Sequence, residues 1–400
     1  MRVLFVSPFL PYPPIAGGHA QVWSWIRRLS RSHETAFVGC YEREAEAEGI
    51  GELARHCALV RAQLRRPTPH AYQSFAQLPQ WVTEFFFVEL ARELARVARG
   101  FRPEVVQFLA TNMAQYERVL PRGARVVTAL DIVSVAYRRR ITAVQGVGRL
   151  QARLDWLRML RYETRVFRRA HHVIAVSAHD ARIIQALAPR ARVTPVPPGV
   201  EPDQLAPRRR APVAGHVLFV GYMEHRPNLD ALLHLYQDIW PRVRRACPEA
   251  RLTVAGHGTR EELARAAPRA LAAMEQDSSV ELAGFVPDLP GLMDRTAALA
   301  APLRLGAGVR NKVVEAMAAG LPVVTTSRGA EGLTVGHERE LLIADEPEGF
   351  ARQLVRLLQD EALQRRLSAA GRTLVAQEHD NERLARRLER ALMEAAGAAA

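Results

Sequence analysis

The chain has 400 residues, of which 48% are hydrophobic and 24% are charged. This length indicates two or three domains, and this composition excludes an intrinsically disordered protein. The net charge is +13, with 55 basic and 42 acidic residues, and Lys312 is the single lysine among many arginines.

The cysteines and the apolar segments indicate the compartment. Cys40, Cys57 and Cys247 lie far apart without a Cys-x-x-Cys pair, so neither a disulfide framework nor a zinc site is predicted. The apolar run at the N-terminus is too short for a signal-peptide core, and no stretch of about 18 uncharged apolar residues occurs. We therefore expect a cytoplasmic protein that does not span a membrane.

Short β-branched runs alternate with longer helical patterns, which predicts an α/β protein with parallel sheets. In the first half, the predicted strands are Arg2–Ser7, Thr35–Gly39, Glu104–Phe108, Arg125–Ala129, His172–Val176 and Val193–Val196. The helical patterns between them include Gly18–Ser32, Trp81–Arg99 and Gln151–Arg169.

The alternation stops at Pro195–Ala214, where six of twenty residues are proline, as is typical of an extended linker. It then restarts with the predicted strands Val217–Val220, Arg251–Ala255, Val280–Gly284, Ala297–Ala300 and Pro322–Thr325. Predicted helices cover Asn228–Ala246, about Asn311–Ala319, and the chain from Pro347 onward.

This order predicts two doubly wound, Rossmann-like domains. We expect an N-terminal domain over 1–200, a linker over 201–214 and a C-terminal domain over 215–379, with a last helix near 380–400 that could pack back on the first domain. Ligands of such sheets bind beyond the carboxyl ends of the strands, so the expected site is a central cleft that both domains face.

The densest chemical signal is Ala301–Gly329. A loop with Gly306 and Gly308 precedes a helix that begins near Arg310 and Lys312 and carries Glu315. Glycines let a backbone approach a ligand, and the free amides of a helix N-terminus favour an anion. The pattern is that of a diphosphate site without a metal. The alternatives are that the loop is only a turn and that Glu315 is a solvated helix residue.

Lys312–Val324 resembles the donor-binding signature of retaining glycosyltransferases of family 4, which have the GT-B fold of two domains. Nearly the whole chain follows the same family pattern, in segments that occur in the family's order: Pro14–Gly18, His171–Asp180, Val196–Pro202, Val217–Met223, Leu252–Gly258 and Val280–Asp288.

The resemblance implies specific roles for these residues. Glu315 would hydrogen-bond the ribose of a nucleotide-sugar donor, and Arg310 and Lys312 would stabilise the leaving diphosphate without a metal or other cofactor. The remaining implied residues are Gly221, His225, Arg226, Gly306, Gly308 and Val309 on the donor side, Gly17, Gly18 and His19 in an acceptor or phosphate loop, and Asp131 as a catalytic candidate on the acceptor side.

Four substitutions depart from the family's usual residues: Ala307 for a glutamate that contacts the donor sugar, Tyr222 for the arginine after Gly221, Leu130 for the histidine before Asp131, and Pro198 for an asparagine. They leave the donor sugar open. Ala307 and Leu130 also keep open a non-catalytic nucleotide-sugar-binding assembly protein. A nucleotide-sugar epimerase of the same fold is the alternative enzyme.

Several polar residues have an ordinary structural interpretation as well. His19 could touch a phosphate or be a structural histidine, and His225 could contact a ligand or simply lie in a loop, as could Glu224. His171 and His172 adjoin a strand and are expected to be structural. The absence of Asp-x-Asp and of Gly-x-Gly-x-x-Gly after the first strand argues against a metal-dependent glycosyltransferase and a nicotinamide dehydrogenase.

Ala136–His172 concentrates the positive charge, with ten arginines against Asp155 and Glu163. A basic amphipathic helix with a tryptophan favours an anionic membrane surface, to which Trp81 and Phe85–Phe87 could add an apolar anchor. The alternative is an apolar stripe that faces the core, with solvated arginines. No nucleic-acid recognition motif occurs. We therefore expect transfer from a nucleotide sugar to a polysaccharide or lipid-linked acceptor, in the cytoplasm or at the inner face of the cell membrane.

Overall fold

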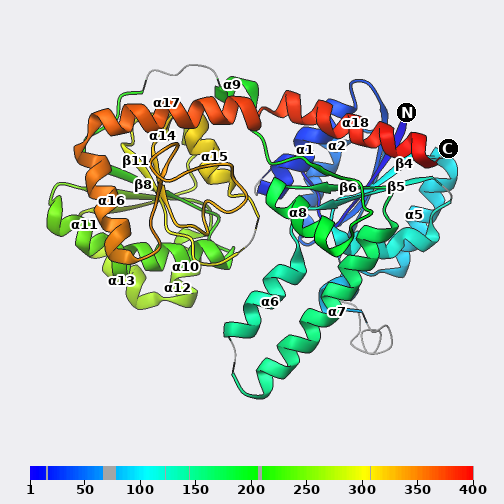
Figure 1. Ribbon diagram of the computed structural model, residues 1–400, viewed down its shortest axis with the longest axis horizontal. Coiled ribbons are helices and arrows are strands. Elements are labelled where there is room, and N and C mark those ends of the chain that lie inside the picture. Colours follow the sequence, from blue (N-terminus) through cyan, green and yellow to red (C-terminus); the bar gives the residue numbers. More distant parts are fainter. Residues whose placement is uncertain are drawn as a thin grey trace. The chain divides into compact units, whose positions relative to one another are not determined.

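The computed structural model describes residues 1–14, 17–65, 78–121, 123–143, 145–205, 210–306 and 308–399. They form two α/β units (Figure 1), and the polypeptide passes from one to the other twice. Unit 1 contains Met1–Pro198 and Glu382–Ala400, and unit 2 contains Gly199–Asn381. This architecture of two doubly wound α/β units is the fold class that the sequence predicted.

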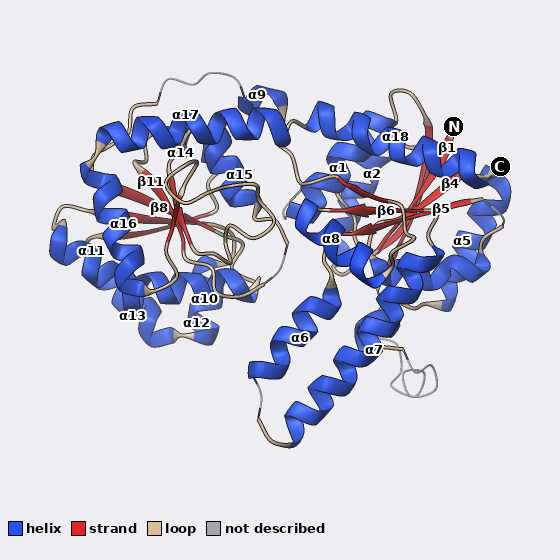
Figure 2. Cartoon of the chain, viewed as in Figure 1, coloured by secondary structure: helices blue, strands red, loops and turns tan. Residues whose placement is uncertain are grey.

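Unit 1 is built on a seven-stranded parallel sheet in the order β3-β2-β1-β4-β5-β6-β7. Helices connect successive strands and cover both faces (Figure 2), so most of the strands are apolar on both sides. The strands are β1 (Arg2–Ser7), β2 (Glu34–Tyr41), β3 (Leu59–Leu64), β4 (Val105–Phe108), β5 (Ala124–Ala129), β6 (His172–Ala175) and β7 (Val193–Pro195).

The helices of unit 1 divide between the two faces of its sheet. They are α1 (Gly17–Leu29), η1 (Glu44–Glu48), α2 (Gly49–Leu53), α4 (Gln80–Thr83), α5 (Val88–Phe101), η2 (Thr111–Val119), α6 (Val133–Ala143), α7 (Val147–Arg169), α8 (Ala178–Leu187) and α18 (Asn381–Ala399). The last helix returns to pack beside α1, where Leu388 and Leu392 share a core with Trp25 and Ile26.

Two elements of unit 1 differ from the sequence prediction. The predicted helix Trp81–Arg99 is two helices, α4 and α5, because the chain between them bonds to a side chain instead of continuing the helical ladder. The Tyr116 hydroxyl donates to the Phe85 carbonyl (2.6 Å) and accepts from the Phe87 amide (2.8 Å). Strand β3 was not predicted, since it lies at the edge of the sheet and is only half-buried.

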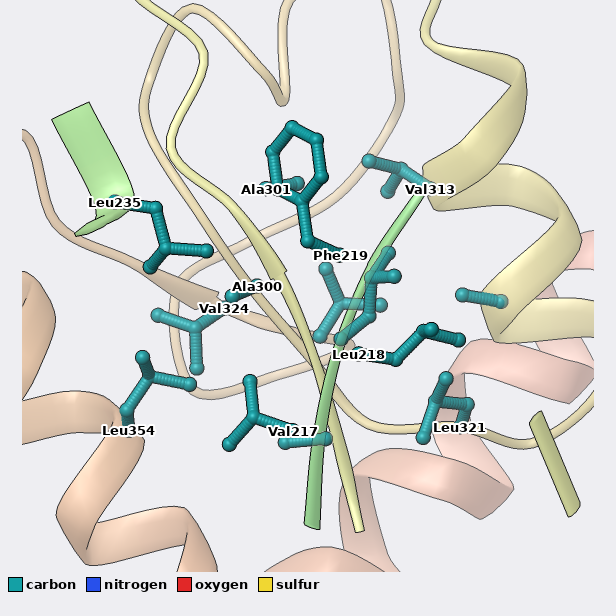
Figure 3. Close-up of a cluster of buried hydrophobic side chains, with 14 of the residues drawn as sticks. Val217, Leu218, Phe219, Leu235, Ala300, Ala301, Val313, Leu321, Val324 and Leu354 are labelled. Atoms are coloured by element: carbon teal, nitrogen blue, oxygen red, sulfur yellow. The ribbon is translucent and has the colours of Figure 1, made fainter. Parts of the chain in front are cut away.

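Unit 2 has a six-stranded parallel sheet in the order β10-β9-β8-β11-β12-β13. Its strands are β8 (His216–Val220), β9 (Arg251–Ala255), β10 (Val280–Gly284), β11 (Ala298–Ala301), β12 (Val323–Thr325) and β13 (Leu342–Ile343), the last of which is too short to have been predicted. Figure 3 shows the core around Phe219 and Val217, where β8 and β11 pack against Val313 of α15 and Leu354 of α16.

The helices of unit 2 alternate with these strands. They are α9 (Pro202–Leu205), α10 (Arg226–His234), the π-helix η3 (Leu235–Ile239), α11 (Trp240–Ala246), α12 (Thr259–Ala266), α13 (Pro268–Gln276), α14 (Leu289–Asp294), α15 (Asn311–Ala318), α16 (Pro347–Gln359) and α17 (Glu361–Glu378). The predicted helix Asn228–Ala246 therefore contains a π-turn just before Pro241.

The described parts of the predicted linker 201–214 belong to the fold of unit 2 instead of standing outside it. Ala211 and Val213 donate backbone hydrogen bonds to the carbonyls of Asp294 and Arg295 (3.1 and 2.9 Å). The half-buried Arg210 donates to the carbonyls of Gly320, Met293 and Thr296 (2.6, 3.3 and 2.5 Å). Proline-rich composition predicted an extended linker here, but the described residues include the short helix α9 and specific hydrogen bonds.

The two segments that lead into and out of unit 2 are bonded to each other. Val200 and Asp380 form an isolated parallel β-bridge, in which the Val200 amide donates to the His379 carbonyl (2.8 Å) and the Asn381 amide donates to the Val200 carbonyl (3.1 Å). The Asn381 side chain adds a bond to Glu201 (2.9 Å). The beginning and the end of unit 2 thus lie side by side.

Candidate functional site

The main candidate site lies in unit 2, at the carboxyl ends of the neighbouring strands β8 and β11. From β8 the chain runs through α10 to β9, and from β11 it runs through α15 to β12, on the other side of the β8–β11 pair. Open α/β sheets bind ligands where the connections diverge in this way. We call this place, formed by the loops 221–225 and 302–310 and the first turns of α15, the β8–β11 site.

Lys312 reaches from α15 to the end of β8. Its ammonium donates to the Val220 carbonyl (2.5 Å) and to Asn228 Oδ1 (2.7 Å), and it lies 5.2 Å from the centre of the Phe219 ring. Burial, and then the charge of Arg310, lower the pKa of Lys312 to about 7. The single lysine of the chain is therefore fixed in place and close to its titration point at neutral pH.

Glycines at the turns after β8 and β9 make room for this arrangement. A Cβ on Gly221 would lie 3.0 Å from Asn228 Cβ and 3.2 Å from Lys312 Nζ. A Cβ on Gly256 would lie 1.6 Å from the Gly221 carbonyl oxygen, so the two turns are in direct backbone contact. Gly221, which the sequence assigned to donor binding, thus also has a packing role.

The loop between β11 and α15 carries the second cation. Gly306 and Gly308 have φ of +94° and +77°, which favour glycine. The Arg310 guanidinium folds back over its own loop, where a Cβ on Gly306 would lie 3.0 Å from both of its terminal nitrogens. Val309 packs partly against the core. Ala307, which departs from the family pattern, lies outside the described residues.

Glu315 lies almost one helical turn beyond Lys312, and its side chain is half-buried. Burial raises the pKa of Glu315, and the charge of Lys312 opposes this shift. No hydrogen bond joins its carboxylate to another residue in the part of the chain that the structure describes. It can therefore accept hydrogen bonds from a ligand without giving up bonds of its own.

The loop after β8 brings His225 to the same site. His225 is the N-cap of α10, and its partial burial, together with the charges of Arg310 and Lys312, lowers its pKa. Arg226 begins α10 and is exposed. Glu224 lies 3.7 Å from His257 Nδ1 and is also exposed, which fits its interpretation as a loop residue.

In unit 1, the acceptor-side candidates gather at the carboxyl ends of β1 and β5. A Cβ on Gly18 would lie 3.8 Å from Leu130 Cδ1 and 3.9 Å from the ring of Phe9. The ring of His19 packs 4.3 Å from that of Phe9, and burial lowers the pKa of His19. Gly17 begins α1, and the exposed Asp131 follows Leu130 directly. The contacts of Gly18 and His19 at this edge are thus apolar, and Asp131 adds an exposed carboxylate.

Two residues of α7 that sequence reasoning did not select hold the neighbouring loops. The carboxylate of Glu163, which is fully buried, accepts hydrogen bonds from the amides of Val133 (2.8 Å) and Ser134 (3.0 Å) at the start of α6. The Tyr162 hydroxyl donates to the Thr111 carbonyl (2.9 Å) in the loop after β4. The sequence signal that could have identified Glu163 was its position: it is an acidic residue among the apolar residues of α7.

The structure also bears on the cysteines, the strand histidine His172, metal groupings and membrane-spanning helices. The three cysteines are buried free thiols, and His172 is buried with its Nε2 2.7 Å from Thr194 Oγ1, as expected of a structural histidine. Within the described ranges, no three His, Cys, Asp or Glu side chains are grouped to hold a metal ion. No helix among them has both the length and the apolar character needed to cross a bilayer.

Comparisons with known proteins agree with this architecture. Residues 214–360 match the family model described as Glycosyl transferases group 1. A Klebsiella pneumoniae protein, named "Uncharacterized 44.6 kDa protein in cps region", is 31% identical over 145 residues, which cover 35% of this chain and 36% of the relative. Phosphatidyl-myo-inositol mannosyltransferase of Mycobacterium tuberculosis is 31% identical over 191 residues, which cover 45% and 48%. The chain thus matches less than half the length of these curated relatives.

Solved structures extend the likeness to the entire chain. Anabaena Alr3699/HepE in complex with UDP-glucose has a TM-score of 0.71 and 14% identity, with 98% of this chain and 99% of that one covered. Sucrose-phosphate synthase from Thermosynechococcus elongatus has a TM-score of 0.72 and 16% identity, with both chains fully covered. The fold is therefore GT-B, with two Rossmann-like units, as the sequence predicted.

Proposed function

We propose that this chain is a glycosyltransferase that moves a sugar from a nucleotide-sugar donor to a polysaccharide or lipid-linked acceptor, with retention of configuration and without a metal. The match of residues 214–360 to the group 1 family supports the activity. The observation that carries the proposal lies within that stretch: a lysine fixed at the end of β8, beside Arg310 and a glycine-rich loop.

The cations suit the charge that this reaction develops. When the bond between the sugar and the diphosphate breaks, the diphosphate leaves with the electron pair. The acceptor oxygen forms the new bond to the sugar carbon, and the proton of its hydroxyl passes to the departing diphosphate. Lys312 and Arg310 would stabilise that leaving group, and so would the backbone amides of Gly306, Gly308 and Val309. An ammonium has three donors, and two of those of Lys312 already hold it in place. The third would bind a phosphate oxygen.

Glu315 would hold the ribose. A carboxylate that is half-buried and accepts no bond from the described residues can take hydrogen bonds from two vicinal hydroxyls. Gly221, His225 and Arg226 complete the proposed donor side. His225 with a lowered pKa is neutral at pH 7, so it would donate one hydrogen bond without adding charge.

The acceptor would meet unit 1, at Gly17, Gly18 and His19 and at Asp131. This edge offers an apolar contact surface and a carboxylate that can orient an acceptor hydroxyl. One relative is named as a phosphatidyl-myo-inositol mannosyltransferase, which supports a lipid-linked acceptor. We propose a cytoplasmic location because the three cysteines are free thiols, as is usual in a reducing compartment.

A panel of nucleotide sugars tests the proposal. Thermal-shift measurements with UDP-, GDP-, ADP- and dTDP-sugars should select one base, because a ligand that binds only the folded state raises the Tm. Hydrolysis or transfer of the selected donor should continue in EDTA and fall at least tenfold in Glu315→Ala. The control Arg265→Ala changes an exposed residue of α12 and should leave both unchanged. Binding without turnover would support the non-catalytic alternative, and interconversion of the donor sugar would support an epimerase.

A further inference from the structure

The pair of helices α6 and α7 carries the basic segment of the chain. In Figure 1 they extend away from the sheet of unit 1 as neighbouring helices, and α7 is 23 residues long. The sequence left two interpretations of this segment, an apolar stripe facing the core or a surface for a membrane. The exposure of individual side chains separates them.

The apolar residues of α7 divide between two opposite faces. Met159, Tyr162, Val166 and Phe167 are buried and belong to the core of unit 1. Leu150, Leu154 and Leu157 are 60%, 44% and 39% exposed. Their spacing of four and three residues places them on one strip of the helix, roughly opposite Met159. The interpretation as a core stripe therefore accounts for the first group and not for the leucines.

Arginines continue the same strip toward the base of α7. Arg161, Arg165 and Arg168 are exposed, and helical geometry places them within about 80° of the leucines around the axis. Arg153 and Arg158 flank the leucines and are exposed as well. Of the two acidic residues in the segment, Glu163 is buried beneath α6, so little negative charge offsets this face. We call Leu150, Leu154, Leu157, Arg161, Arg165 and Arg168 the α7 strip.

We propose that the α7 strip docks onto a lipid bilayer with anionic headgroups. Leucines at one end and arginines along the rest match a surface with an apolar interior and a negative outer layer, because the leucines would enter the boundary between headgroups and acyl chains to about 5–10 Å. The leucines span about 10 Å along the axis, and Arg168 lies about 16 Å beyond Leu157, so the strip contacts several headgroups at once.

Two other partners fit this strip less well, a second copy of the chain and a single-stranded nucleic acid. A second copy would bring its own arginines against these, which opposes pairing through the leucines. Single-stranded nucleic acid binds through aromatic rings on which bases stack, and leucine has none. The docking proposal stands apart from the proposed function, since α7 belongs to unit 1 and the donor residues belong to unit 2.

The aromatic segment that the sequence added to this anchor does not take part. Phe85, Phe86 and Phe87 pack partly buried against the core of unit 1. Phe86 stacks on Tyr116 with ring centres 5.6 Å apart, and the Arg65 guanidinium lies 4.8 Å from the centre of the Phe85 ring. Trp81 packs against the same core. These rings contribute to the core of unit 1, so the proposed docking surface rests on the α7 strip and not on them.

Vesicle co-sedimentation of the full chain tests the proposal. We expect binding to phosphatidylglycerol–phosphatidylcholine vesicles and little binding to phosphatidylcholine alone. Arg161→Gln/Arg165→Gln/Arg168→Gln should weaken binding on the order of a hundredfold, since each basic residue near an anionic surface contributes about fivefold. The control Arg92→Gln/Arg99→Gln/Arg386→Gln removes the same charge from exposed positions elsewhere in unit 1 and should weaken binding less than threefold.

The leucines are tested in the same way. Leu150→Ser/Leu154→Ser/Leu157→Ser should weaken binding to the same vesicles at least tenfold, and the control Val88→Ser/Val119→Ser/Met393→Ser, at three other exposed apolar positions, should not.

Circular dichroism and donor-induced Tm shifts should match the wild type in every variant, which separates this test from that of the proposed function. Equal effects of strip and control variants, equal binding to neutral vesicles, or no binding would overturn the proposal. A concentration-dependent dimer that the leucine variant abolishes would replace the bilayer with a second copy.

Discussion

The carboxyl edges of the two sheets are built from the same kind of strand-to-helix loops, yet they carry different chemistry. In unit 2, the edge holds Lys312 and Arg310 by short contacts to backbone and side chains. In unit 1, the corresponding edge is made of van der Waals and ring contacts among Gly18, Leu130, Phe9 and His19.

Under the proposed function, this difference would suit two kinds of ligand. A leaving diphosphate needs fixed positive charge, and a fixed charge needs polar partners that hold it against the cost of burial. An acceptor hydroxyl that attacks the sugar needs to be oriented but needs little charge nearby, so van der Waals and ring contacts suffice. The predictions below test whether unit 2 depends on its charges and unit 1 on its packing.

The largest effect should follow from removing the amine of unit 2. Lys312→Met keeps an unbranched side chain, one heavy atom shorter, and removes the donors to Val220, Asn228 and a phosphate. We expect turnover of the selected donor to fall by about 10² to 10³, as it does when one electrostatic donor to a developing charge is lost. Arg265→Met is the control and should stay within twofold. Steady-state kinetics measures both, and wild-type turnover in Lys312→Met would remove Lys312 from the reaction.

The next effect concerns pH. The folded pKa of Lys312 is lowered to about 7, so the ammonium loses its proton as the pH rises through 7. Because an anion binds the protonated form, affinity for UDP should fall on the order of tenfold between pH 6.5 and 8.5. In the free protein the unfolded chain binds the extra proton between about pH 7 and 10.5, so the contribution of Lys312 to stability increases with pH across that window. Calorimetric titration with UDP measures this dependence, and the affinity of Lys312→Met for UDP should not change between pH 6.5 and 8.5.

A smaller effect is expected from the carboxylate of α7 in unit 1. Glu163→Gln leaves one oxygen for two backbone amides, so we expect the free energy of unfolding to fall by about 1–3 kcal/mol. Asp155→Asn, at a half-buried position on the same helix, should change it by less than about 0.5 kcal/mol. Urea denaturation measures both. UDP affinity should be unchanged, and a loss of UDP affinity in Glu163→Gln would contradict the separation of the two edges.

The smallest effect should come from a methyl group at the edge of unit 1. The new Cβ of Gly18→Ala meets its neighbours at ordinary contact distances of 3.8 and 3.9 Å, so stability should change by less than about 1 kcal/mol. Gly221→Ala in unit 2 is the matched comparison. Its Cβ would lie 3.0 Å from Asn228 and displace the partner of Lys312, so UDP affinity should fall together with stability. Thermal unfolding with and without UDP separates the two results.

The main elements and the β8–β11 site could be predicted because their signals are local. Periodicity located most of the strands, and the glycines, Lys312 and Glu315 lie within one short segment of the sequence. The partners of Lys312 could not be predicted, since Val220 and Asn228 are 92 and 84 residues away in the chain. The same holds for Glu163, whose partners lie 30 and 29 residues away, and for Arg210, which bonds to carbonyls up to 110 residues away. Composition assigned Arg210, the last of three consecutive arginines, to the linker, because an arginine in such a run gives no sign of what it bonds.

The bridge between Val200 and Asp380 has a consequence for the ancestry and engineering of the chain. Both termini belong to unit 1, and unit 2 is one uninterrupted stretch whose beginning and end are paired, so unit 2 is in effect an insertion into unit 1. Inserted domains with adjacent ends can be exchanged without rethreading their host. A graft of residues 199–381 from a relative with another nucleotide preference would therefore be a modular replacement, in which the host keeps the α7 strip and the acceptor-side edge.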